Sequence, residues 1–409
     1  MIGRMVGKNA LGAAGLANSL AFLFASIAIG GLPVVGPLIA KSKASKNLAE
    51  TKATYLATLR VALIFCLLIG LISLFLYLNF DLLRQTQEIN AIAKEFFLIL
   101  IGSSLPLFFF TAYKQLSDGL SLPRVAMYIT FIGLLVNIGL NWILIRKMGI
   151  QGAAWSTFAV RLVMTIIMAI YIYKSKKFQE VNVMMADPSR ISALTRRILQ
   201  LSIPGGLQFF FEIGAFSFAV VMMGWISEDA LAAHQIAINI AAVTYMMASG
   251  IGYASGIRVG AALGKKSAYQ VKLAANSGFI LVFLFMSLAA LLIYLFRIPL
   301  VQLYIRNEEI EQLAVSLLLI AALFQLSDGI QVVALGVLRG ISDVNIPAVI
   351  TFVAYWVISL PLGYFLAFKF NLGADGVWLG LLGGLSFAAL LSTIRFYRLY
   401  QIKERYKLK

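Results

Sequence analysis

Charged residues are scarce in this sequence. They make up 12% of the chain, whereas soluble proteins carry about 25%. Hydrophobic residues make up 61%, and long apolar runs recur, each near the roughly 20 residues that a helix needs to cross a membrane. The short alternating segments typical of a membrane β-barrel are missing. The sequence therefore predicts an all-α polytopic membrane protein, because lipid cannot satisfy an open backbone.

Cysteine and histidine each occur once. Cys66 lies in an apolar run and cannot form an internal disulfide, so we expect it to pack as a small side chain. His234 has no cysteine or second histidine nearby, which argues against a metal site and favours a hydrogen bond near a helix end. The sequence also lacks a P-loop, an HExxH motif and a nucleophile elbow. We therefore expect no cofactor, no ATP-driven transport by this chain alone and no enzyme activity.

Eleven apolar segments are candidates for membrane spans. They cover residues 12–39, 55–79, 91–113, 122–145, 150–173, 199–226, 230–262, 271–296, 311–338, 346–368 and 374–397. The longest hydrophilic connection, 174–198, separates five spans from six. We expect an N-terminal lobe at 1–183, a C-terminal lobe at 184–409 and an inter-lobe linker at 174–198.

Basic residues exceed acidic ones by 34 to 17 and concentrate in alternate loops and in the tail "RFYRLYQIKERYKLK". Lys and Arg favour the cytoplasmic side of a membrane, so we expect the linker and the C-terminus to be cytoplasmic. Basic residues scattered over short loops argue against nucleic acid as a partner. The expected partner is the lipid bilayer, and the expected oligomeric state is a monomer.

The two halves share glycine and proline positions. One alignment matches Pro123 with Pro347, Gly139 with Gly363, Gly149 with Gly373 and Gly152 with Gly376, and another matches Gly30 with Gly250 and Gly36 with Gly256. We infer two parallel repeats of six spans, of which the first shows only five. The unmatched span is 199–226, whose counterpart would precede Met1. Transporters are commonly built from such repeats.

Two acidic residues lie deep inside expected spans. Glu212 is about twelve residues into its span and Asp328 about seventeen, which places both near the middle of the membrane at about 1.5 Å per residue. A central charge costs roughly 2.5–3.5 kcal/mol, so each should face a cavity, be protonated or pair with another group. The alternative is a protonated acid that only ties helices together. The alignment pairs Asp328 with Ser104, so this acidity is not shared by the two halves.

Amides and aromatic rings accompany both carboxyls at helical spacing. The candidate cleft residues are Gln208, Phe209 and Phe216 near Glu212, and Phe324, Gln325 and Gln331 near Asp328. Carboxylates and rings together suit an amphipathic organic cation. Such carboxyls could exchange H⁺ or Na⁺ against this substrate, so we expect no resident metal but a coupling ion at the two acids.

Arg161 is a further candidate for the cleft, about ten residues into the span that starts near Gly152. It could line the cleft, pair with an acid or a carbonyl, or snorkel to the interface. Pro33, Pro37 and Pro361 lie within spans and should kink them.

Several segments resemble motifs of the multidrug and toxic compound extrusion (MATE) family, in its bacterial NorM-type branch. They are "LAAHQIAINIAAVTYMMASGIGYASGIRVGAALG", "SIPGGLQFFFEIGAF", "FQLSDGIQVVALGVLRGISDVNIP", "MIGRMVGKNALGAAGLANSL" and "MGIQGAAWSTFAVR". The resemblance covers nearly the whole chain. It implies two six-helix lobes around a cleft, efflux of cationic drugs coupled to Na⁺ or H⁺, and location in the bacterial inner membrane.

The resemblance also assigns roles to particular residues. It implies a cation site formed by Glu212 and Asp328, the two acids that burial selects. Phe324 stands where many members have a tyrosine, which removes one hydroxyl from this site. The sequence begins where the family's first helix should be ending, so we expect that helix to be missing through a fragmentary chain, a misassigned start codon or a shortened member.

Two other functions remain open on the sequence alone. A flippase for lipid-linked precursors would need several Arg and Lys at mid-depth, and only Arg161 qualifies. A non-transporting membrane scaffold or an inactive fragment is the second alternative.

Overall fold

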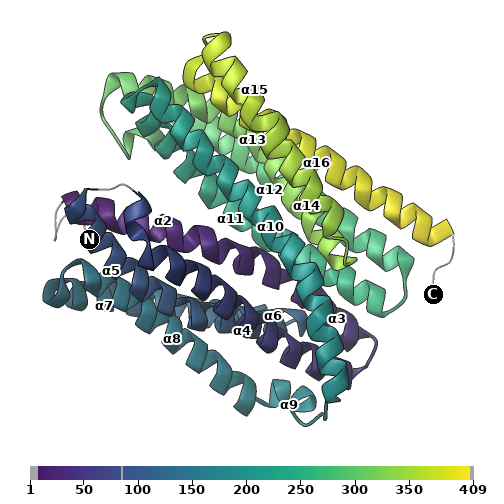
Figure 1. The fold of residues 1–409 in the computed structure, drawn as a ribbon. Helices are drawn as coiled ribbons and strands as arrows, with labels where there is room; N and C mark the ends of the chain where they lie inside the picture. The colour runs from purple at the N-terminus through teal and green to yellow at the C-terminus, as the bar shows by residue number, and fades with distance from the viewer. Residues whose placement is uncertain (1–7, 84–85, 406–409) are drawn as a thin grey trace. The chain divides into compact units, whose positions relative to one another are not determined.

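The computed structural model describes residues 8–83 and 86–405, and within these ranges it consists of helices and short connections, without a strand (Figure 1). The expected missing helix concerns the chain at and before Met1, and the last residues of the basic tail are 406–409. Both lie outside the described residues.

Eleven helical segments of the described chain are long and apolar enough to cross a membrane, which confirms the expected spans. The elements before residue 188 are α2 (Lys8–Gly31), η1 (Leu32–Val34), α3 (Val35–Ala44), α4 (Leu48–Leu78), η2 (Phe80–Leu83), α5 (Gln87–Gly102), α6 (Ser104–Gly119), α7 (Pro123–Met148), α8 (Ile150–Lys174) and α9 (Lys176–Asn182). The later elements are α10 (Pro188–Ile226), α11 (Glu228–Gly264), α12 (Ala268–Gln302), α13 (Glu308–Gly340), α14 (Asn345–Phe352), η3 (Val353–Ser359), α15 (Leu360–Tyr364), η4 (Phe365–Lys369) and α16 (Gly373–Arg405).

Short side chains set the starts of several spans. The side-chain oxygens of Asn47, Ser227, Ser267 and Asn307 each accept a hydrogen bond from a backbone N–H in the first turn of the following helix. Such caps satisfy donors that the helix itself leaves free. Each of these four spans therefore begins at a polar cap, a few residues earlier than the apolar run alone indicates.

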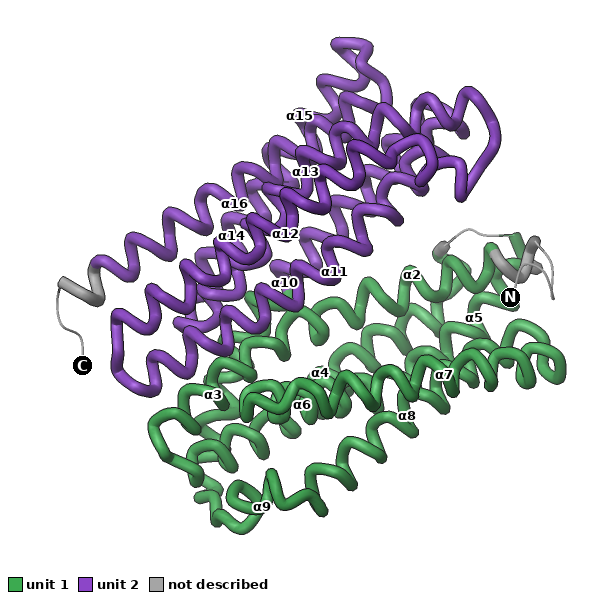
Figure 2. The backbone as a smooth tube through the Cα atoms, turned by 180° about the vertical axis from the view of Figure 1, so that it is seen from behind, with its two compact units in different colours: residues 1–206 green, residues 207–409 purple. Residues whose placement is uncertain are grey.

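The chain divides into two compact units, residues 1–206 and 207–409, which Figure 2 colours green and purple. The division falls inside α10. Residues 188–206 belong to the first unit because Ser202 and Gly206 pack against the backbone of α2 and Arg190 pairs with Glu50 of α4 at 2.6 Å. The lobe boundary that we expected at 183/184 stays a prediction.

Prolines and π turns interrupt two of the spans. Pro33 lies in η1, a short 3₁₀ segment between α2 and α3, and the span continues beyond it. Pro361 lies in α15 between two π-helical segments, η3 and η4. Proline lacks an N–H donor and crowds the preceding turn, so both interruptions lie near the places where the sequence predicts kinks. The second one also carries Tyr355, in η3.

In the second unit α13 lies in the centre and contacts α11, α12 and α16. Glycines allow its closest approach to α11, because a Cβ on Gly256 would lie 2.5 Å from the Gly336 carbonyl oxygen. A Cβ on Gly340 would lie 2.7 Å from the Gly256 oxygen and 2.8 Å from Val259. This contact fixes the register in which α13 presents Asp328.

The first unit contains the same contact. A Cβ on Gly119 of α6 would lie 2.8 Å from the Gly36 carbonyl oxygen of α3 and 2.6 Å from Ile39. Left-handed turns also recur in matching places: Lys46 and Lys266 (φ 58° and 55°), Ser121 and Ser342 (φ 64° and 63°), and Gly149 and Gly373 (φ 60° and 54°). The backbone thus carries the parallel repeat that the sequence predicts.

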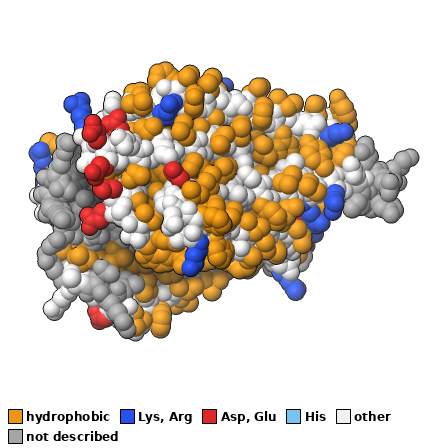
Figure 3. All heavy atoms as spheres, turned by 90° about the horizontal axis from the view of Figure 1, so that it is seen from above, with side chains coloured by type: hydrophobic (Ala, Val, Ile, Leu, Met, Phe, Trp, Pro, Cys, Tyr) orange, Lys and Arg blue, Asp and Glu red, His pale blue; other side chains and the backbone are white. Residues whose placement is uncertain are grey.

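Hydrophobic side chains cover most of the face drawn in Figure 3, on which charged groups are sparse. Two helices at matching places in the repeat, α4 and α12, expose rows of large apolar residues. Examples are Leu71 and Phe75 on α4, and Leu284, Leu288 and Leu295 on α12. This surface suits contact with lipid and not with water.

Candidate functional site

The two deep carboxyls lie within the second unit, Glu212 on α10 and Asp328 on α13. Their residues are only 7% and 3% exposed, and their charges interact electrostatically. The helices meet through rings, since Phe216 and Phe324 lie edge to face with centroids 6.1 Å apart. The structure therefore brings together the two acids that the sequence singles out.

Three buried glutamine amides accompany the carboxyls. The Gln325 side-chain oxygen accepts a 2.7 Å hydrogen bond from the Thr244 hydroxyl, and the Gln331 oxygen accepts one of 3.2 Å from the Tyr355 hydroxyl. The Nε2 groups of Gln208, Gln325 and Gln331 are buried and have no partner in the described part of the chain. Buried amide donors normally find an acceptor, so these groups are available to a carboxylate or a bound molecule.

Two tyrosines contribute hydroxyl groups that the sequence analysis missed. Tyr245 of α11 and Tyr355 of η3 both interact electrostatically with Glu212 and Asp328. Tyr355 is fully buried. Phe324 itself has no hydroxyl, but Tyr245 and Tyr355 supply two hydroxyl groups from neighbouring helices. The sequence alone does not indicate these two tyrosines, because tyrosine is common in apolar spans. Only the packing of α11 and η3 beside the carboxyls identifies them.

Arg339 is the cationic residue that interacts electrostatically with Glu212. Its Nη2 donates a 3.4 Å hydrogen bond to the Gln208 side-chain oxygen, one turn before Glu212. Its Nε is buried without a partner among the described residues. Arg339 escaped the sequence analysis because it follows the predicted span 311–338 directly, whereas α13 continues to Gly340.

Aromatic rings form one wall of the site. Phe216 lies 6.0 Å from the Tyr355 ring, and Phe324 lies 5.9 Å from the Trp378 ring. Trp378 donates a 3.1 Å hydrogen bond to Nδ1 of His234, which is fully buried on α11. His234 thus forms the hydrogen bond expected from the sequence, and its partner is a side chain of another helix, α16.

Two candidate residues take no part in this network. Phe209 is half-buried and has no ring contact with another described aromatic residue. Arg161 belongs to the first unit, where its Nη1 donates a 2.6 Å hydrogen bond to the Ser103 hydroxyl. No cluster of three or more His, Cys, Asp or Glu that could hold a metal occurs within residues 8–83 and 86–405. The carboxyl oxygens of Glu212 and Asp328 are ligands of the kind that a hard cation prefers.

The glycine contacts correct one detail of the repeat. Asp328 lies twelve residues before Gly340, and Leu107 lies twelve before Gly119. The counterpart of Asp328 is therefore Leu107 and not Ser104, because packing in this pair of helices follows a different offset from that of the Pro123–Pro347 match. The conclusion that the first unit has no matching acid is unchanged.

The sequence profile of MatE matches residues 1–143 and 204–365. The chain belongs to the MatE family. The probable multidrug resistance protein NorM of Bacillus thuringiensis subsp. konkukian (strain 97-27) is 34% identical over 383 residues, which cover 91% of this chain and 83% of the relative. The multidrug resistance protein NorM of Vibrio vulnificus (strain YJ016) is 33% identical over 344 residues, 81% of this chain and 74% of the relative.

Solved MATE structures share the fold. An outward-facing multidrug resistance MATE family transporter of the MOP superfamily superposes with a TM-score of 0.90 at 20% identity, covering 98% of this chain and 90% of the other. The eukaryotic MATE transporter AtDTX14 gives 0.88 at 18% identity, covering 97% and 89%. Members of the MatE family are secondary transporters and not enzymes. The matched ranges contain Glu212 and Asp328, whereas Arg161 falls between them.

Proposed function

We propose that this MatE-family chain exports amphipathic organic cations in exchange for Na⁺ or H⁺, with Glu212 and Asp328 as the coupling site. The observation that carries the proposal is the buried, electrostatically interacting pair of carboxyls on two helices. The names of the NorM relatives, which describe multidrug resistance, support the substrate class.

A pair of buried carboxyls has a reason to bind a cation. Two negative charges in a dry environment repel each other and lose hydration, and a proton or a sodium ion relieves both costs. Arg339 supplies one positive charge beside Glu212, but the described residues place no such partner on Asp328. In the proposed cycle the coupling ion binds at the pair, and its loss toward the cytoplasm returns Glu212 to Arg339.

The aromatic wall and the carboxyls together favour a cationic substrate. Phe216, Phe324 and Tyr355 lie on the same helices as the acids or beside them. A cation gains from ring faces and from negative charge in the same place. Substrate and coupling ion then compete for one negative site, which is the simplest basis for exchange. The proposed location is the bacterial inner membrane, with the C-terminus in the cytoplasm.

Transport by the purified chain in liposomes tests the proposal. Ethidium is the probe, and an imposed Na⁺ or H⁺ gradient is the driving force. We expect Glu212→Gln and Asp328→Asn each to lower gradient-driven ethidium transport at least tenfold. Glu309→Gln is the matched control, since Glu309 is an exposed acid in the first turn of the same helix as Asp328. Gradient-driven transport that survives both substitutions contradicts the assignment.

A further inference from the structure

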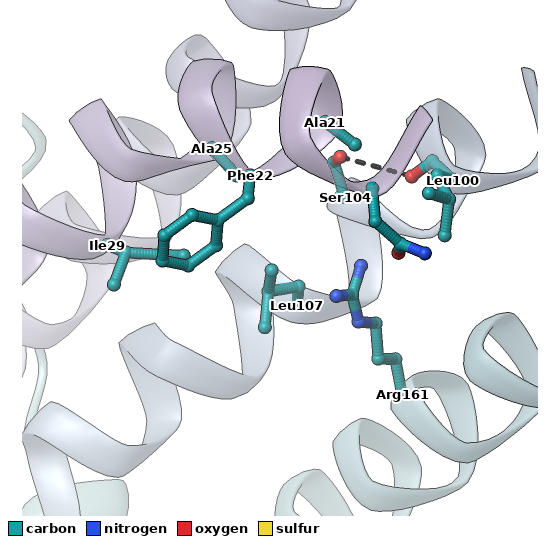
Figure 4. A pocket seen from close by; sticks show the side chains of 9 residues that line it. Ala21, Phe22, Ala25, Ile29, Leu100, Ser104, Leu107 and Arg161 are labelled. Atoms are coloured by element: carbon teal, nitrogen blue, oxygen red, sulfur yellow. Dashed lines mark hydrogen bonds between the residues drawn. The ribbon is translucent and has the colours of Figure 1, made fainter. Parts of the chain in front are cut away.

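A second polar feature lies inside the first unit, apart from the network around Glu212. A cavity of about 270 Å³ lies between α2, α5, α6 and α8. Its lining combines the polar residues Asn18, Ser104 and Arg161 with apolar ones that include Phe22, Ile29 and Leu107. Figure 4 shows Arg161 extending from α8 toward α2, with the Phe22, Ile29 and Leu107 side chains around the same space.

The repeat places this cavity where the second unit has its candidate cation site. Leu107 is the counterpart of Asp328 through the Gly119 and Gly340 contacts described above. Ala25, also in the lining, lies eleven residues before Gly36, as Tyr245 lies eleven before Gly256. The first unit thus has an apolar residue where the second has an acid, and its one charged lining residue is a cation.

The charge of Arg161 is not compensated within the described residues. Its single hydrogen bond there joins Nη1 to Ser103, and none of the ion pairs that these residues form includes it. Arg161 lies near the middle of α8 (Ile150–Lys174), where an isolated charge is costly in a membrane. An intramembrane cation without an acid commonly marks a ligand or ion pathway.

The guanidinium has a free edge suited to one kind of group. With Nη1 bonded to Ser103, Nε and Nη2 remain without a partner in the described chain, and together they form the edge that binds a carboxylate through two parallel hydrogen bonds. The other polar lining residues form hydrogen bonds elsewhere: the Ser104 hydroxyl donates to the Leu100 carbonyl at 3.3 Å and the Asn18 amide donates to the Ala14 carbonyl at 2.9 Å. The remaining lining is mostly apolar, which suits a hydrocarbon body better than a hydrated inorganic anion.

We propose that this cavity binds the carboxylate group of a lipophilic organic acid, with Arg161 as its anchor and Phe22, Ile29 and Leu107 around the apolar body. The site is independent of the proposed coupling site.

Binding of three molecules of one shape tests this proposal. The probes are 2-naphthoate, neutral 2-naphthamide and cationic 2-naphthylmethylammonium, titrated calorimetrically into the purified chain at pH 7.5. We expect naphthoate to bind at least tenfold more tightly than naphthamide. The ammonium compound, a candidate ligand of the separate coupling site, should not displace naphthoate. Arg161→Gln should reduce naphthoate to the affinity of naphthamide, whereas Arg161→Lys should keep part of the preference. Equal binding of naphthoate and naphthamide by the unaltered chain overturns the proposal.

Two controls separate this site from other effects. Arg146→Gln removes an exposed arginine of the neighbouring α7 and should leave naphthoate binding unchanged. Glu212→Gln should also leave it unchanged, so a failure of the coupling-site proposal does not touch this one. If Arg161→Gln does not fold, phenylglyoxal labelling of the unaltered chain replaces it. Naphthoate should slow labelling of Arg161 but not of Arg146, and labelling of Arg161 at an unchanged rate contradicts the proposal.

Discussion

Gly256→Ala should weaken the contact between α11 and α13 on which the candidate coupling site depends. The added Cβ would lie 2.5 Å from the Gly336 carbonyl oxygen and 3.2 Å from its carbon. Ordinary contact begins at 3.4 Å, and backbone atoms cannot rotate away, so the helices must separate by roughly 1 Å. Overpacking of this kind costs about 1–3 kcal/mol, while the higher helix propensity of alanine returns about 1 kcal/mol. We expect a net loss of about 1 kcal/mol.

Gly250→Ala is the matched control on the same helix. Nothing lies within 4 Å of a Cβ at Gly250, so this substitution should stabilise the chain by about 0.4–1 kcal/mol. Both variants are unfolded in mixed micelles with increasing sodium dodecyl sulfate, and tryptophan fluorescence reports the transition. The free energy of unfolding of Gly256→Ala should be lower than that of Gly250→Ala by about 1.4–2 kcal/mol. Identical transitions would show that α11 and α13 do not approach through their glycines.

Three further predictions concern single side chains. Tyr355→Phe removes a hydroxyl that donates a hydrogen bond to the buried Gln331 amide. The apparent affinity for the coupling ion in liposome transport should fall about three- to tenfold, which corresponds to the net free energy of one hydrogen bond. Arg339→Gln removes the positive charge that competes for Glu212, so the ion concentration for half-maximal transport should fall while the maximal rate also falls; an unchanged half-maximal concentration contradicts the role of Arg339. Arg190→Ala breaks an exposed ion pair with Glu50 and should cost at most about 1 kcal/mol in the same unfolding experiment.

Hydropathy was sufficient to predict the number of spans but not where each helix begins. The apolar run that begins at residue 199 predicts a span from that point, but α10 begins at Pro188. Its first turns are polar and therefore do not appear in a hydropathy profile. Its start is fixed by Asp187, whose carboxylate accepts a 2.9 Å hydrogen bond from the Ser189 N–H and one of 2.6 Å from its hydroxyl. These two bonds lower the pKa of Asp187. The helix end therefore follows from local capping, which a hydropathy profile does not contain.

The acids of the candidate site could be found from sequence, but most of their surroundings could not. Glu212 and Asp328 stand out because a carboxylate in an apolar run is costly wherever the helix lies. Tyr245 and Tyr355 do not stand out, because tyrosine is ordinary in a membrane span and only the packing of α11 and η3 brings both hydroxyls near the carboxyls. Arg339 does not stand out either, because it lies at a helix end, where arginine is common.

The π segments on either side of Pro361 affect how Tyr355 can move. A π turn contains more residues than an α turn. The span from α14 to η4 therefore contains more residues than an α-helix of the same number of turns. If η3 rewound as α-helix while another π turn formed further along, the residues between would rotate by about 100° for each residue transferred. Tyr355, which lies inside η3, could in this way swing away from the carboxyls while the span remained helical throughout and no neighbouring helix was displaced.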